Sequence, residues 1–108
     1  MKYHITNIPI KGKGMIALDT IKYDEIICLC HTIPMKSETA VWKYLFSNNG
    51  LHLALGDVSW VNHSSKPNSK IQWIDDTIHL ISTRDILEGE EITHTYSNIE
   101  DYDTSGWV

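Results

Sequence analysis

Residues 59–74 read SWVNHSSKPNSKIQWI, a stretch in which a constrained polar loop stands directly behind the pair Trp60-Val61. From Asn62 to Asn68 the loop contains two Asn, one His, two Ser and one Pro. Asn, Ser and Pro favour turns for local backbone reasons, so this composition on its own indicates only a turn. The apolar run SKIQWI that follows the loop is typical of a strand.

The pattern on either side of this loop predicts short strands joined by turns, and hence a mostly β fold. Asp75-Asp76 separates SKIQWI from TIHLIST and predicts a hairpin between the two runs. The segment SETAVWKYLF fits either a short helix capped by Ser37 or a strand. The other expected strands are YHITNI, GMIAL after a turn or bulge at Gly12-Lys13-Gly14, EIICLCHTI ended by Pro34, LHLAL after the turn Asn48-Asn49-Gly50, and EEITHTY.

Two segments of the chain are similar to each other, because residues 21–27 and residues 86–92 share the pattern I-x-x-[D/G]-E-x-I. Each segment follows one apolar strand and precedes another. We expect a tight connection that is used twice, in which the first Ile points inward, the chain turns, and an acidic residue enters the next strand. The match is too short to predict a repeat architecture.

The composition indicates one folded domain: the chain has 108 residues, of which 42% are hydrophobic. A formal net charge of −5 argues against non-specific binding of nucleic acid, which needs Lys and Arg to neutralise phosphates. The charge fits either plain solubility or attraction of a basic partner. No apolar run is long enough to span a membrane, and MKYHITNIPI is too short and polar for a signal peptide. We therefore expect a soluble protein in a reducing, intracellular compartment.

The metal-ligating residue types show no ligand spacing. Cys28 and Cys30 form no CxxC motif, so a cysteine-based zinc site is unsupported, and a disulfide between them is geometrically unfavourable. His94 stands close before Tyr96 and could tune its surroundings. Tryptophans in such a domain serve the core or a dimer interface, which is the expected place of Trp42, Trp60 and Trp73. Ordinary strand positions without metal are expected for His4, His31, His52, His79 and His94.

Three blocks carry more information together than any one of them does alone. They are Gly12-Lys13-Gly14, the block WVNHSSKPN at residues 60–68, and the block GEEITHTY at residues 89–96. In this order they resemble the SET-domain family of protein lysine methyltransferases, over about Ile5 to Tyr96. The size is most similar to the minimal SET proteins of viral and bacterial type. The resemblance implies a β-clip-like SET fold of several small sheets with a C-terminal pseudoknot, as one domain 1–108 with its core at about 5–96 and a short tail 97–108.

The resemblance also implies a site for S-adenosyl-L-methionine built around the Asn-His-Ser segment. The Asn62 side chain and the His63 backbone would face the cofactor, since Asn offers both donors and acceptors. Gly14 would allow close approach of the backbone at the methionine end of the cofactor. Pro67 and Asn68 would fix the loop by presetting φ and by capping backbone groups. The cofactor-binding residues implied in this way are Lys13, Gly14, Met15, Asn62, His63 and Trp107.

Aromatic residues would form the reactive end of the site. The resemblance makes Tyr96 the catalytic tyrosine and matches Tyr44, in YLFS, to a second tyrosine of the lysine channel. Larger members complete that channel with a cysteine-rich zinc segment, which this chain lacks. Tyr102, Trp107 or a partner subunit must then complete it, so Tyr44 and Tyr102 are the expected substrate-binding residues. Trp107 would alternatively pack on adenine.

These implications lead to one expected function and two alternatives. The expected function is a protein lysine N-methyltransferase that acts on a lysine in a basic peptide segment, with a histone-like tail as one candidate. A narrow, dry channel would deliver the amine deprotonated, because desolvation lowers the pKa of lysine. The alternatives are a catalytically inactive SET-like module that binds a peptide, and a cofactor-binding regulator. The joint presence of Asn62, His63 and Tyr96 favours the enzyme. The protein would work in the cytoplasm, or in the nucleus or chromatin of a host cell, and a homodimer would bury further surface.

Overall fold

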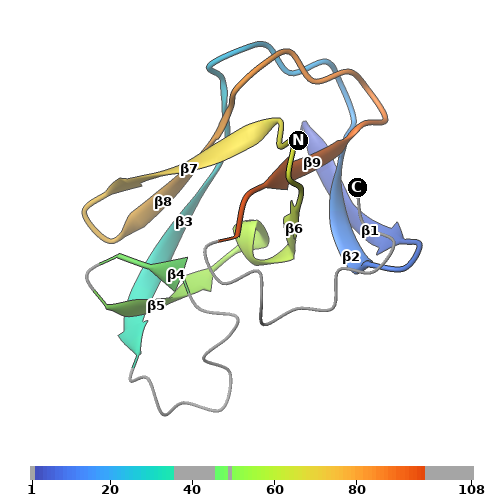
Figure 1. Ribbon diagram of the computed structural model, residues 1–108. Coiled ribbons are helices and arrows are strands. Elements are labelled where there is room, and N and C mark those ends of the chain that lie inside the picture. Colours follow the sequence, from blue (N-terminus) through green and yellow to red (C-terminus); the bar gives the residue numbers. More distant parts are fainter. Residues whose placement is uncertain (1, 36–45, 49, 97–108) are drawn as a thin grey trace.

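The computed structural model describes residues 2–35, 46–48 and 50–96, which fold into two small sheets (Figure 1). The strand order is β1-β2-β9-β6 in one sheet and β4-β5-β3-β8-β7 in the other. The mostly β fold of small sheets predicted from the sequence is therefore confirmed. The elements are β1 (Tyr3–Ile8), β2 (Gly12–Ala17), β3 (Ile26–Met35), β4 (Phe46–Ser47), β5 (Leu51–Leu55), the 3₁₀ helix η2 (Asp57–Trp60), β6 (Asn62–His63), β7 (Ser69–Ile74), β8 (Thr77–Ser82) and β9 (Glu91–His94).

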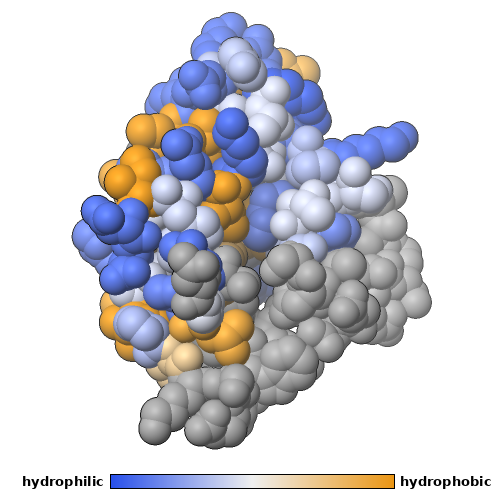
Figure 2. Space-filling view, turned by 60° about the vertical axis from the view of Figure 1, so that its left-hand side comes forward, coloured by the Kyte–Doolittle hydropathy of each residue, from blue (hydrophilic) through white to orange (hydrophobic). Residues whose placement is uncertain are grey.

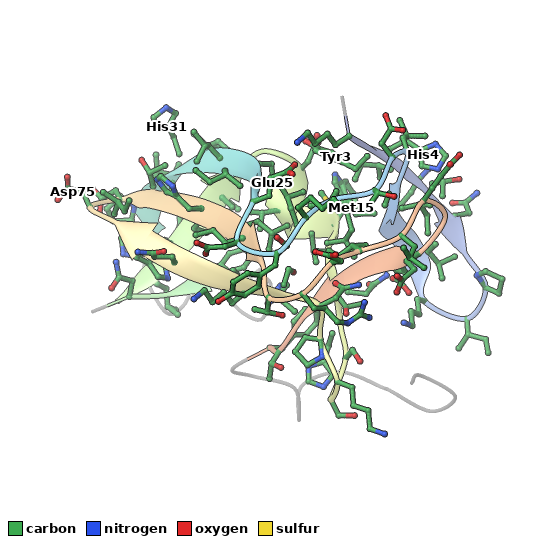
Figure 3. The ribbon with its side chains drawn as sticks, turned by 90° about the horizontal axis from the view of Figure 1, so that it is seen from above. Tyr3, His4, Met15, Glu25, His31 and Asp75 are labelled. Atoms are coloured by element: carbon green, nitrogen blue, oxygen red, sulfur yellow. The ribbon has the colours of Figure 1, made fainter. Side chains whose placement is uncertain are left out.

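Two of the predicted turns connect strands as expected. The predicted turn at Gly12-Lys13-Gly14 is wrong, because these residues belong to β2 and pair with residues 6–8 of β1, and the chain turns at residues 9–11 instead. Asp75 has a φ of 52°, which lets β7 turn back as β8, and Figure 3 shows it at the tip of that hairpin. Between β4 and β5 the N–H of Asn48 donates to the carbonyl of Gly50 at 2.9 Å, and Gly50 has a φ of 129°. The ambiguous segment SETAVWKYLF lies outside the described residues except for Phe46, with which β4 begins.

The prediction that Pro34 ends its strand is wrong, because β3 continues through Pro34 to Met35. Pro34 pairs with His52 of β5, while the other edge of β3 loses its neighbour where β8 begins at Thr77. The N–H of Thr32 donates to Asp76 O at 3.0 Å, in the turn that precedes β8. Backbone groups two residues apart point to the same side of a strand, so the nitrogen of Pro34 lies beyond that turn. A proline is tolerated there because no ladder bond needs its missing hydrogen.

The two similar segments, residues 21–27 and 86–92, meet at a β-bridge between Ile21 and Ile86. Each of these residues donates its N–H to the carbonyl of the other, at 2.8 and 2.7 Å, and both side chains are fully buried. Three residues later in each copy the chain turns with a positive φ, of 64° at Asp24 and 86° at Gly89. The expected tight connection is therefore present twice, and its two copies pair with each other.

This pairing is reciprocal beyond the bridge. The N–H of Ala17 donates to Glu90 O at 2.9 Å, and the N–H of Ser82 donates to Glu25 O at 3.0 Å. Strand β2, before the first connection, pairs with β9, which follows the second, and β8 pairs with β3 in the same way. The units β1-β2-β3 and β7-β8-β9 are thus similar, and each places its third strand in the sheet of the other.

Apolar side chains fill the core, and others remain exposed on the outer face of the five-stranded sheet. His31 on β3 lies opposite Leu55 of β5 on one side and opposite Thr77 of β8 on the other. Thr77 in turn lies opposite Ile74 of β7. Residues directly opposite one another share a face of the sheet, so all four lie on the same face. Apolar side chains gather on this side of the molecule (Figure 2), where Leu55 is 56% exposed. The fully buried core side chains include Met15, Ile21, Val58, Val61, Ile78, Leu80, Ile86 and Ile92.

Candidate active site

Strand order brings the three sequence blocks together. Strand β9 lies between β2 and β6, so GEEITHTY stands between Gly12-Lys13-Gly14 and the Asn-His-Ser segment (Figure 1). Asn62 and His63 pair in parallel with Thr93 and His94. Residues far apart in the sequence are therefore neighbours on adjacent strands, at one end of the four-stranded sheet.

Asn68 fastens the loop after β6 to β9. Its side chain is buried, its Oδ1 accepts the N–H of Thr93 at 2.9 Å, and its Nδ2 donates to Glu91 O at 2.8 Å. The hydroxyl of Ser69 donates to Thr93 O at 2.6 Å. Asn68 was expected to cap backbone groups, and the groups that it caps belong to β9. Its side-chain amide satisfies a backbone N–H and a backbone C=O of β9, as a neighbouring strand would do.

The Asn62 side chain is buried and held by two acceptors. Its Nδ2 donates to Lys13 O and to Glu91 Oε2, each at 2.9 Å. Both amide hydrogens are therefore bound within the protein. The side-chain oxygen is the part of this amide that remains for a ligand, and it can only accept.

Gly14 is required by the packing of these same side chains. A Cβ at this position would lie 2.8 Å from Asn62 Nδ2, 3.0 Å from Glu91 Oε2 and 2.5 Å from Ile8 Cγ1. The missing side chain of Gly14 thus leaves room for side chains of the protein itself, whereas the sequence led us to expect that it leaves room for a cofactor. The neighbouring Met15 is fully buried in the core and pairs with Ile5 on one side and Ile92 on the other.

Two charged residues that were not expected at the site belong to this cluster. Lys11 Nζ lies 2.8 Å from Glu91 Oε1, and the two side chains are only 6% and 18% exposed. Glu91 was visible as part of the GEEITHTY block. Lys11 gave no signal, because a lysine beside a Gly-rich turn is ordinarily solvated.

Tyr96 lies against the Asn-His-Ser segment through two hydrogen bonds. Its hydroxyl donates to Val61 O at 2.9 Å, and its N–H donates to His63 Nδ1 at 2.9 Å. The rings of Tyr96 and His63 meet edge to face with centroids 5.4 Å apart. Burial, and then the positive charge of Lys11, lower the pKa of His63, so its Nδ1 is held as an acceptor.

His94 has one buried nitrogen without a partner. Its Nδ1 lies 3.2 Å from Thr95 O, so this nitrogen is the donor and Nε2 carries the lone pair. Nε2 is buried and has no hydrogen bond. Burial lowers the pKa of His94 to about 4, so the imidazole is neutral. Its ring centroid lies 5.1 Å from that of Tyr96 and 6.1 Å from that of Phe46.

His94 also lines a cavity of about 270 Å³ on the β7 side of β9. Its lining contains neither Asn62 nor Tyr96, so this cavity is not a passage between those two residues. A buried polar atom without a partner calls for a donor from water or from a ligand. The lining residues are Pro67, Ser69, Lys70, Ile71, Thr83, His94 and Thr95.

The expected site residues fall into three groups. The structure brings Lys13, Gly14, Asn62, His63 and Tyr96 into one cluster. Met15 lies in the core beneath them. The others lie outside the described residues, and they are Tyr44, Tyr102 and Trp107.

Two features are absent from the described ranges 2–35, 46–48 and 50–96. These ranges contain no group of three or more His, Cys, Asp or Glu side chains that could hold a metal ion. Nor do they contain a helix of the length and apolar character needed to cross a membrane.

Comparisons with known proteins agree with this arrangement of blocks. The family model described as the SET domain matches residues 12–97, which include β2, the Asn-His-Ser segment and Tyr96. A solved Plasmodium falciparum structure, described as a "putative histone methyltransferase", is similar with a TM-score of 0.78 and 25% identity. The similarity covers 90% of this chain and 94% of that one. No curated protein matches the sequence. Since the family model spans most of the chain and the strands that hold the cluster, the chain belongs to the SET domain family.

Proposed function

We propose that this protein is a protein lysine N-methyltransferase that uses S-adenosyl-L-methionine. The observation that carries the proposal is the hydrogen bond from the Tyr96 hydroxyl to Val61 O, one residue before Asn62. It joins the expected catalytic group to the expected cofactor-binding segment. Membership of the SET domain family, and the likeness to a protein described as a histone methyltransferase, support the same activity.

The polar groups of the cluster suit the amino acid end of this cofactor. With both hydrogens of Nδ2 bound to protein, Asn62 offers an acceptor, which matches an ammonium group rather than a carboxylate. Lys13, whose backbone carbonyl accepts from Asn62, carries the positive charge that a carboxylate would require, whereas the charge of Lys11 is already paired with Glu91. The cofactor, when bound, supplies a sulfonium methyl group for transfer to a lysine nitrogen.

Tyr96 would act as a fixed oxygen beside the reacting atoms. Because its hydroxyl hydrogen points to Val61 O, its lone pairs point elsewhere and can stabilise positive charge on a methyl group. The Tyr96 N–H bond to His63 holds the backbone of the same residue. Such prior orientation lowers the barrier because no reorganisation is needed at the moment of reaction.

The substrate we propose is a lysine within a basic peptide segment, for which a histone-like tail is one candidate. The net charge of −5 favours encounter with a cationic chain. Tyr44 and Tyr102 are the proposed contacts for the lysine side chain, and Trp107 for the cofactor. A homodimer remains a prediction, and the exposed apolar face that includes Leu55 and Ile74 is the surface it would bury.

The experiment is transfer of label from methyl-labelled cofactor to a panel of basic proteins, with the modified residue located by mass spectrometry. We expect label on lysine. Tyr96→Phe should bind cofactor but slow transfer by about 10²-fold, whereas Asn62→Ala should lose cofactor affinity. The matched controls are Tyr23→Phe, at an exposed tyrosine, and Asn7→Ala, at an exposed asparagine.

Two outcomes would favour the other classes of function. Cofactor binding without transfer to any tested protein would favour a cofactor-binding regulator. Absence of cofactor binding would favour a catalytically inactive module, and isothermal titration of a peptide panel would then be the next measurement.

A further inference from the structure

Lys11 and Glu91 form an ion pair that is buried far more deeply than its position in the sequence suggests. Lys11 lies in the turn between β1 and β2, yet its side chain is 6% exposed. Lysines are almost never buried to this degree unless they are paired. The pair lies directly behind Asn62, since the second oxygen of Glu91 accepts from Asn62 Nδ2 at 2.9 Å.

Fold stability alone does not account for this pair. Removing two charges from water is costly, and apolar side chains of similar volume often serve a fold as well as a buried ion pair. What apolar residues could not supply is the acceptor that Glu91 presents to Asn62. The role of the Lys11–Glu91 pair is therefore to orient the side-chain amide of Asn62.

The orientation of Asn62 depends on Glu91 because an amide has two nearly isosteric ends. The nitrogen lies 2.9 Å from two acceptors, Lys13 O and Glu91 Oε2, so only one of the two orientations satisfies both. A turn of 180° would place the amide oxygen against these acceptors. Lys11 completes the arrangement by binding the other oxygen of Glu91 at 2.8 Å.

We propose that Lys11 and Glu91 are positioning residues that hold the Asn62 oxygen toward the ligand and so make the site selective for a ligand bearing an ammonium group. The inference rests on the proposed function, whose cofactor carries such a group. Without the carboxylate, only Lys13 O favours this orientation, so the turned amide becomes populated and presents hydrogens to the ammonium. Selectivity for the ammonium is then lost, while contacts to the rest of the ligand remain.

The test compares two ligands that differ by one group. S-adenosylhomocysteine carries the ammonium, and its deamino analogue, 4-(5′-deoxyadenosin-5′-ylthio)butanoate, lacks it. Isothermal titration should show that wild-type protein prefers the first by about 10- to 100-fold, the range for a hydrogen bond to a charged group. In Glu91→Gln the preference should fall toward unity, with the affinity for the deamino analogue changed by less than about twofold.

Lys11→Met is the second variant, since it keeps the length of the side chain and removes its charge, and the preference should fall here too. The controls are Glu88→Gln and Lys22→Met, both at exposed positions of the chain. A readout without ligand is the pair of Asn62 side-chain amide signals in a ¹H–¹⁵N spectrum, assigned through Asn62→Asp. In Glu91→Gln these side-chain signals should lose their protection from exchange, while the backbone amide signals should keep the chemical-shift dispersion of a folded protein.

Each outcome is decisive. A preference that survives Glu91→Gln overturns the inference, as does an equal loss of affinity for both ligands. Protection of the Asn62 amide that does not change in Glu91→Gln also overturns it. Wild-type protein that binds neither ligand refutes the proposed function together with this inference, which distinguishes that failure from failure of the inference alone.

Discussion

The buried imidazole of His94 predicts that the protein loses stability in mildly acidic solution. In the folded protein, burial lowers the pKa of His94 from 6.5 to about 4. In the unfolded chain the same group takes up its proton near pH 6.5. The unfolded state therefore binds more protons between these values, so the free energy of unfolding falls as the pH falls through about 6.5 and the loss is complete at about pH 4.

The size of the effect follows from the gap between the two pKa values. The full contribution is about 3 kcal/mol, of which about 2 kcal/mol is lost between about pH 7.5 and about pH 5. This window lies above the range in which Glu90 titrates, since a bond from the Leu87 N–H lowers the pKa of that carboxyl. His63, whose pKa is also lowered, adds a loss of the same sign.

The measurement is urea unfolding of wild-type protein and His94→Leu at the two ends of this window. Leucine has a similar volume and no titrating group, so the variant should lose about 2 kcal/mol less than wild type. At the upper pH the variant loses only the 3.2 Å hydrogen bond from Nδ1 to Thr95 O, since Nε2 has no partner, so it should be less stable there by no more than about 1 kcal/mol. The control is His4→Leu, at an exposed position on β1 (Figure 3), which should keep the wild-type pH dependence. Equal pH dependence in wild type and His94→Leu would refute the reasoning.

Three further predictions concern single contacts. Ile10 is a β-branched residue at a φ of 74°, so Ile10→Asn should stabilise the protein by about 1 kcal/mol in thermal unfolding, and a destabilisation would contradict the strain. Asn68→Ala leaves a buried N–H and C=O of β9 without partners and should cost about 3 kcal/mol in chemical unfolding; a cost below about 1 kcal/mol would mean that water replaces the amide. Gly14→Ala places a Cβ against Ile8 and Asn62, so it should lower the melting temperature and weaken cofactor binding together, and an unchanged affinity would show that the Asn62 amide had not moved.

The strands and the connection used twice could be predicted because they depend on local pattern. Alternation and turn residues gave the β7–β8 hairpin, and the pattern around Ile21 and Ile86 gave its two turns. The exchange of strands between the two units could not be predicted, because it depends on which edges meet after the chain has folded. Pro34 was misjudged for the same reason: a proline ends a strand only where a neighbour needs its N–H, and β8 does not extend that far.

The expected cluster around Asn62, His63 and Tyr96 rested on resemblance, and the structure adds the bonds from Tyr96 to His63 and to Val61, the residue before Asn62. Lys11 could not have been found from the sequence, because its burial depends on where β9 places Glu91. The direction in which the Asn62 amide faces is also a tertiary property. It follows from two acceptors on different strands, neither of which is near Asn62 in the sequence.

The exchange of third strands between the two units has a consequence for how the chain can be divided. If the backbone were cut at Gly50, one fragment would keep β1 to β4 and the other β5 to β9. Each fragment would then hold the strand that completes a sheet of the other, β3 for β8 and β9 for β2. Such halves should be unstructured apart and should reassemble into the native protein when mixed, which would make this small domain a natural scaffold for fragment complementation.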